Sequence, residues 1–105
     1  MFFELRSYPV FPGKMEAWVR FMDEEIIPYQ LSKGMCIPAS FVDEENYRYV
    51  WFRRFEDEAE RDRLYAAVYD EDIWTMDMRP RVGDYIDHDG VTVSILRATP
   101  RSFVR

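Results

Sequence analysis

The sequence predicts a small α+β fold whose elements follow the order strand, helix, strand, strand, helix, strand. Four segments alternate apolar and polar positions and are rich in β-branched and aromatic residues, as strands are; they are residues 2–10, 35–42, 47–55 and 91–98. The two main helices are expected at residues 14–31 and 58–69.

The first helix is defined by one apolar face. Apolar side chains recur there every three or four residues, at Met15, Trp18, Val19, Met22, Ile26 and Tyr29. The strand before it, Phe2 to Val10, ends at the Pro12-Gly13 pair. Pro28 lies inside the helical pattern, so we expect a kink or a break in the last turn, and Gly34 is expected to stop the helix.

The middle two strands form a hairpin around the polar connection 43–46. Pro38 cannot donate a backbone hydrogen bond, which predicts an edge position or a bulge in the strand 35–42. The strand 47–55 is apolar on both faces, with one arginine on each. Tyr49, Trp51 and Arg53 share one face, and Val50, Phe52 and Arg54 share the other.

The second half repeats a helix and a strand. Asp57 with Glu60 resembles a capping box at the start of the helix 58–69. A short helical piece over 73–78 and one further turn from Pro80 to Ile86 are expected next. A turn at 87–90 leads into the last strand, and the tail 99–105 is expected to be extended and free to dock on a partner.

This order is the split β-α-β arrangement of ferredoxin-like folds, with a four-stranded antiparallel sheet and two main helices on one of its faces. The other face is expected to carry Tyr8, Val50 and Phe52. Leaving such side chains in water forgoes about 1.5–3 kcal/mol each. We therefore expect a homodimer in which two open sheet faces pack together.

Composition narrows the class of protein. A chain of 105 residues suits a single domain, 1–105, and its net charge of −6 argues against a nucleic-acid partner. The lone Cys36 cannot form an intrachain disulfide, and no apolar run approaches the ~18 residues of a membrane span. With no signal-peptide pattern at the amino terminus, we expect a cytoplasmic protein without membrane association.

Several short motifs resemble the NIPSNAP family in order and spacing. They are Phe3–Tyr8 followed by Pro12–Lys14, Val50–Phe55 running into Asp57–Asp62, Tyr69–Trp74, and Leu96–Pro100. The resemblance implies a dimeric α/β barrel, in which the sheets of two ferredoxin-like protomers close one barrel. It implies no particular reaction, because the family carries no catalytic motif that maps onto this chain. Relatives in the fold group include cofactor-free monooxygenases, isomerases, polyketide cyclases and haem-binding enzymes.

A ligand pocket is expected between the sheet and the helices. Its candidate residues are Trp18, Phe41, Tyr49, Trp51, Arg53, Arg61, Tyr65 and Trp74, with Phe3, Leu5 and Met22 beside them. Aromatic walls with an arginine suit a planar molecule that carries a carboxylate, enolate or phenolate. The alternative is that the aromatic residues fill the core, that Arg53 pairs with Glu4 or Asp84, and that Arg61 pairs with Asp57 or Glu58.

Other reactive side chains are few. His88 is the single histidine and a candidate acid–base group, although its turn setting is equally typical of an exposed residue. Cys36 is expected to be a buried, inert thiol. No metal-ligand spacing is present, and no cofactor is expected; haem ligation by His88 lacks the usual helical setting.

The sequence therefore supports two functional hypotheses. The first is a homodimer that binds a small apolar or aromatic, partly anionic molecule, with cofactor-free monooxygenation or isomerisation as its chemistry. The second is a non-enzymatic interaction or binding module. A cavity of about 300 Å³ or more under the sheet would favour the first.

Overall fold

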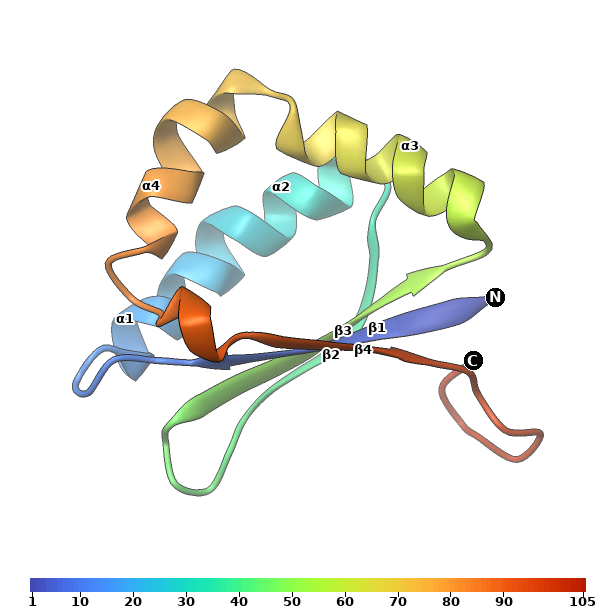
Figure 1. Cartoon of the computed structure of the whole chain (residues 1–105), viewed down its shortest axis with the longest axis horizontal. Helices are drawn as coiled ribbons and strands as arrows, with labels where there is room; N and C mark the ends of the chain where they lie inside the picture. The colour runs from blue at the N-terminus through green and yellow to red at the C-terminus, as the bar shows by residue number, and fades with distance from the viewer.

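The helices lie together on one face of a four-stranded antiparallel sheet (Figure 1). The computed structural model describes all residues, 1–105. The strands are β1 (Phe2–Pro9), β2 (Cys36–Val42), β3 (Arg48–Phe55) and β4 (Thr92–Leu96), and their order across the sheet is β2-β3-β1-β4. The predicted ferredoxin-like arrangement is confirmed.

The first helix continues past Pro28. It consists of α1 (Met15–Phe21), a wider π-helical turn (Met22–Ile26) and α2 (Ile27–Ser32). Of the predicted kink or break, the break does not occur, because the chain widens before the proline, whose missing N–H would otherwise interrupt the ladder. In the wider turn the N–H of Ile27 bonds to the carbonyl of Met22, five residues back. Gly34, at φ 101°, ends the helix as predicted.

The second main helix, α3, spans Glu58–Tyr69 as predicted. The Asp57 carboxylate accepts the N–H of Glu60 at 2.8 Å, while the Glu60 carboxylate accepts the N–H of Glu56 at 3.1 Å, one residue before the position of a standard capping box. A π-helical turn (Ile73–Met78) and α4 (Arg79–Val82) follow. The helix ends at Val82, earlier than expected, because Ile86 pairs with Val10 in an isolated β-bridge.

The expected irregularity around Pro38 is confirmed. Strand β2 is at the edge of the sheet, and its pairing with β3 shifts between Cys36 and Ala39. The edge position leaves Cys36 exposed, so the expected burial of this thiol is wrong.

The faces of β3 follow the predicted alternation, but those of β1 were misassigned. Cross-strand partners share a face, and Leu5 pairs with Phe52 while Tyr8 pairs with Tyr49. Leu5, and Phe3 with it, therefore lie on the open face, outside the predicted pocket. Tyr8 lies among the helices rather than on the open face, in the same cluster as Trp18.

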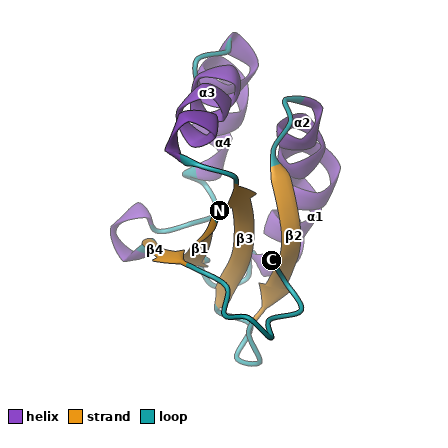
Figure 2. Cartoon of the chain, turned by 90° about the vertical axis from the view of Figure 1, so that its right-hand side faces the viewer, coloured by secondary structure: helices purple, strands orange, loops and turns teal.

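The open face of the sheet has no helix over it (Figure 2). Phe41 and Leu96 remain 54% and 41% exposed. The tail turns back through a hydrogen bond from the Ser102 N–H to the Thr99 carbonyl, instead of running extended, and borders a hollow beside Phe3. Phe103, at the tip of the tail, is fully exposed.

Candidate functional site

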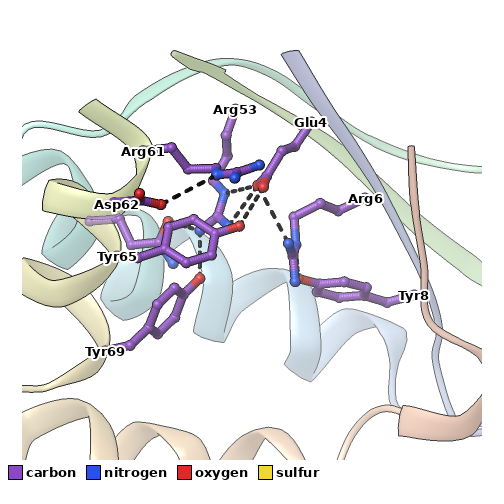
Figure 3. Close-up of polar contacts among 9 residues, drawn as sticks. Glu4, Arg6, Tyr8, Arg53, Arg61, Asp62, Tyr65 and Tyr69 are labelled. Carbon is purple, nitrogen blue, oxygen red and sulfur yellow. Dashed lines mark hydrogen bonds and ion pairs between the residues drawn. The ribbon is translucent and has the colours of Figure 1, made fainter. Parts of the chain in front are cut away.

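Arg53 is the centre of a buried polar cluster under the helices (Figure 3). Its Nε and Nη2 atoms donate to one oxygen of Glu4, at 3.1 and 2.8 Å. Nη1 donates to the side-chain oxygen of Gln30 and to the hydroxyl of Tyr69, at 3.2 and 2.5 Å, and Nη2 also donates to the hydroxyl of Tyr65 at 3.0 Å. Every guanidinium nitrogen is therefore hydrogen-bonded. The ion pair between Arg53 and Glu4, one of the alternatives that the sequence offered, is present.

Glu4 is the carboxylate that this cluster shares. Arg6 reaches the same oxygen at 3.4 Å, and the Tyr65 hydroxyl donates to the other oxygen. Burial acts to raise the pKa of Glu4, but the charge of Arg53 and the hydrogen bonds from Tyr65 and Arg53 outweigh it, so the net pKa lies below its ordinary value. Burial also raises the pKa of Tyr65, to about 12. At neutral pH Glu4 is ionised and Tyr65 keeps its proton.

We expect Glu4 to make the protein acid-sensitive. Its pKa is lower in the folded than in the unfolded chain, so the unfolded state binds more protons in acid and stability falls as the pH drops below about 5. Urea denaturation at a series of pH values measures this fall. In Glu4→Gln the free energy of unfolding should fall less steeply with pH, although at neutral pH it should be lower than that of the wild type. Equal slopes for the two proteins would contradict the prediction.

A cavity of about 200 Å³ lies beside this cluster, between the sheet and the helices. Its deep wall contains the buried Trp18 and Trp51, and its rim contains the exposed Arg79 and His88. Arg6, from β1, supplies another cation. No aspartate or glutamate is among the 14 lining residues. In a chain with a net charge of −6, this is a locally positive site.

The structure brings together part of the predicted pocket. Trp18, Trp51, Trp74 and the candidate acid–base group His88 all line the cavity. Tyr49, although buried on the same face, is absent from the lining.

Besides Tyr49, four predicted residues do not line the cavity. Arg53 and Tyr65 belong to the polar cluster behind it. Phe41 pairs with Val50 and therefore lies on the open face of the sheet. Arg61 lies over the ring of Phe2 at 5.5 Å and approaches Asp62 at 3.9 Å, so neither its predicted pocket position nor its predicted ion pairs are found.

Sequence reasoning missed Arg6, Tyr8 and Arg79. Alternation along the first strand puts Glu4, Arg6 and Tyr8 on one face. Because Glu4 pairs with Arg53, which faces the helices, choosing this partner would have placed Arg6 and Tyr8 on the helix side as well. The position of Arg79 depends on the path of the chain after α3, for which the sequence has no comparable signal.

Several polar hydrogens near the cavity have no acceptor. The indole Nε1 atoms of Trp18 and Trp51 are buried and have no hydrogen-bond partner. Tyr8, which lines the cavity, accepts a hydrogen bond from Arg6 Nε at 2.8 Å, which leaves its own hydroxyl hydrogen free. A buried donor without an acceptor costs about 1–3 kcal/mol, so this hydroxyl favours an occupant that carries acceptor oxygens.

The structure offers neither a cluster of metal ligands nor a membrane-spanning helix. No three histidine, cysteine, aspartate or glutamate side chains converge as a metal site requires. None of the helices combines the length and apolar character needed to cross a bilayer.

The fold and cavity define an α+β protein of the ferredoxin-like class, and solved structures share its architecture. A NIPSNAP family protein of unknown function from Agrobacterium tumefaciens superimposes with a TM-score of 0.88 at 21% identity, over 100% of this chain and 94% of that one. An uncharacterised NIPSNAP domain protein from Burkholderia xenovorans gives 0.84 at 16% identity, over 97% and 98% of the two chains. The chain thus has the fold of NIPSNAP structures, as its motifs predicted.

A dimeric ferredoxin-like protein from an uncultured marine organism has a TM-score of 0.65 at 10% identity, with both chains covered completely. The fold group therefore includes a dimeric protein. No protein-family model and no curated protein matches the sequence.

Proposed function

We propose that this chain forms a homodimer that binds a small apolar or aromatic, partly anionic molecule in the cavity between the sheet and the helices. The observation that supports ligand binding is the lining of the cavity. Ten of its 14 lining residues are hydrophobic, and its charged side chains are cationic. Such a lining suits a ligand with a flat apolar body and an anionic group.

The cavity volume limits the size of that ligand. At about 200 Å³ it is smaller than the ~300 Å³ at which drug-sized sites begin. An apolar cavity of about 150 Å³ is enough to hold benzene in an engineered protein. The ligand we propose is therefore a single substituted ring or an equally small enol.

The chemistry we propose for this site is cofactor-free oxygenation or isomerisation. Isomerisation would move a proton by way of an enolate, and oxygenation would add dioxygen, as the oxidant, to an enolate or phenolate that supplies the electrons. Arg6 and Arg79 would stabilise the negative charge of either intermediate. His88 on the rim is the candidate acid–base group.

The proposed dimer joins the open sheet faces. Leu5, Val50 and Phe52 lie on that face without a helix over them, and Phe41 is more than half exposed. Burying this surface against a second copy recovers the hydrophobic free energy that a monomer forgoes. Ser102 and Val104 of the tail border a hollow with Phe3 and Phe52 on that face, so the adjacent, exposed Phe103 would contact the partner copy.

Native mass spectrometry of protein purified without added ligand tests the proposal. We expect a dimer that carries a reproducible small adduct. Phe52→Glu places a charge in the centre of the proposed interface and should shift the species to monomer; Glu24→Gln, a change on the exposed side of the first helical region, is the control. A stable wild-type monomer would overturn the dimer, and a clean dimer without adduct would weaken the proposed ligand.

The second candidate is a non-enzymatic interaction module. The small cavity volume and the fully exposed Phe103 favour it. In that case the tail, which carries Arg101 and Arg105 and no acidic residue, would contact a protein partner. Loss of a cellular partner, with no change in ligand binding, on Phe103→Ala would support this candidate.

A further inference from the structure

We infer that the cavity selects an organic anion with acceptor oxygens at both ends of one ring, as in a hydroxyaryl carboxylate or its enol equivalent. We further infer that Arg53 sets this preference from behind the cavity wall, without touching the ligand. The inference rests on the proposed small-molecule function and names the chemical class of the ligand.

Arg53 fixes which atoms its neighbours can offer. A guanidinium has only donors, so Gln30 must turn its carboxamide oxygen toward Nη1, 3.2 Å away. The NH₂ group of Gln30, which lines the cavity, is then the end left to a ligand. Tyr69 accepts from the same Nη1 at 2.5 Å, so its hydroxyl hydrogen is also left to donate. One buried arginine thereby turns two amphoteric side chains into donors.

Arg6 has the same effect on Tyr8. Its Nε donates to the Tyr8 hydroxyl, which is left with a hydrogen to donate. Glu4 holds the Nη1 of Arg6 at 3.4 Å, so the acid of the cluster is occupied by two arginines and is absent from the cavity lining. The side-chain oxygens of this cluster already accept hydrogen bonds from Arg6 or Arg53. The groups left for a ligand are therefore donors.

Trp18 and Trp51 supply the apolar part of the deep wall, beside the donors of Gln30, Tyr69 and Tyr8. At the rim, Arg79 and His88 are exposed and line the same cavity. The cavity thus has neutral donors at depth and a cation at its mouth. A ring with a phenolic or enolic oxygen pointing inward and a carboxylate at the rim matches both ends.

Titration calorimetry with three matched probes tests the inference. The probes are p-hydroxybenzoate, benzoate and p-cresol, which carry both oxygen functions, the carboxylate alone and the hydroxyl alone. We expect p-hydroxybenzoate to bind most tightly and each of the other probes to bind about tenfold more weakly, since each lacks one set of contacts.

Gln30→Glu tests the role of Arg53. The new carboxylate can still accept from Arg53, but it replaces the NH₂ donor at the cavity with an acceptor. We expect about a tenfold loss in affinity for p-hydroxybenzoate and for p-cresol, whose hydroxyl oxygens point inward, and a smaller change for benzoate. Tyr69→Phe, which removes one hydroxyl without adding charge, should show a weaker form of the same pattern. Arg63→Met, at an exposed position on α3, is the control, and thermal unfolding verifies that each variant is folded.

The outcomes separate this inference from the proposed function. If p-cresol binds as tightly as p-hydroxybenzoate, or if Gln30→Glu leaves the preference among the probes unchanged, the inference is overturned while small-molecule binding stands. If none of the probes binds at millimolar concentration, the inference also fails. In that case an adduct in the native mass spectrum would still support the binding of some other small molecule in the cavity.

Discussion

Arg53→Met should lower the free energy of unfolding by about 3–5 kcal/mol at neutral pH, because it removes one partner of a buried ion pair. Arg53 is fully buried, and the side chain of Glu4 is 3% exposed. Methionine fills much of the arginine's volume, so the expected loss is electrostatic more than steric. Gln30 and Tyr69 lose their donor as well, which adds unsatisfied acceptors to the uncompensated carboxylate.

The loss should be limited by the second cation of the cluster. Arg6 stays 3.4 Å from Glu4, and its side chain is 19% exposed, so it keeps part of the charge compensated. The pKa of Glu4 should rise in the variant, because the positive charge that lowers it is gone. The difference in stability between wild type and variant should therefore narrow in acid, where Glu4 takes up a proton.

Urea denaturation at neutral and acid pH measures both effects. The double variant Glu4→Gln/Arg53→Met removes the unpaired charge and should recover part of the loss. Arg20→Met is the matched control, because Arg20 forms only an exposed i,i+4 pair with Glu16 and should cost less than about 1 kcal/mol. A loss for Arg53→Met no greater than that of Arg20→Met would show that the buried pair contributes little to stability.

The sequence predicted the elements well because their signals are local. The alternation along β3, the capping residue Asp57 and the stop at Gly34 each act within a few residues and are found where expected. The helix does not break at Pro28, and the sequence could not exclude a break because a π-helical turn, which absorbs the missing hydrogen bond, has no clear sequence pattern.

The site was predicted only in part because it depends on pairing between distant residues. Alternation groups the residues of β1 into two sets but does not say which set faces the helices. That choice follows from the pairing of Glu4 with Arg53, 49 positions away. Once it was missed, Leu5 was placed in the pocket while Tyr8 was placed outside it. The cavity-facing roles of Gln30 and Arg79 likewise depend on packing between helices.

The other large effect is expected at Trp18, where Trp18→Ala should lower the free energy of unfolding by about 3–5 kcal/mol. Trp18 is 0% exposed. It packs against four aromatic rings at centroid distances of 5.8–6.1 Å, those of Tyr8, Phe21, Tyr49 and Tyr85. Its removal leaves a void that these rings can fill only partly, because they belong to β1, β3, α1 and the segment after α4.

Trp18→Phe separates packing from the indole N–H. It keeps an aromatic ring and removes a buried donor that has no partner, so its cost should be less than half that of Trp18→Ala. Thermal unfolding with added indole then reports on the void: indole should raise the melting temperature of Trp18→Ala more than that of wild type, because it refills the space that the side chain left. An equal shift in both proteins would mean that the void has collapsed. A cost for Trp18→Phe as large as that for Trp18→Ala would mean that the smaller ring does not preserve the packing of the indole at this site.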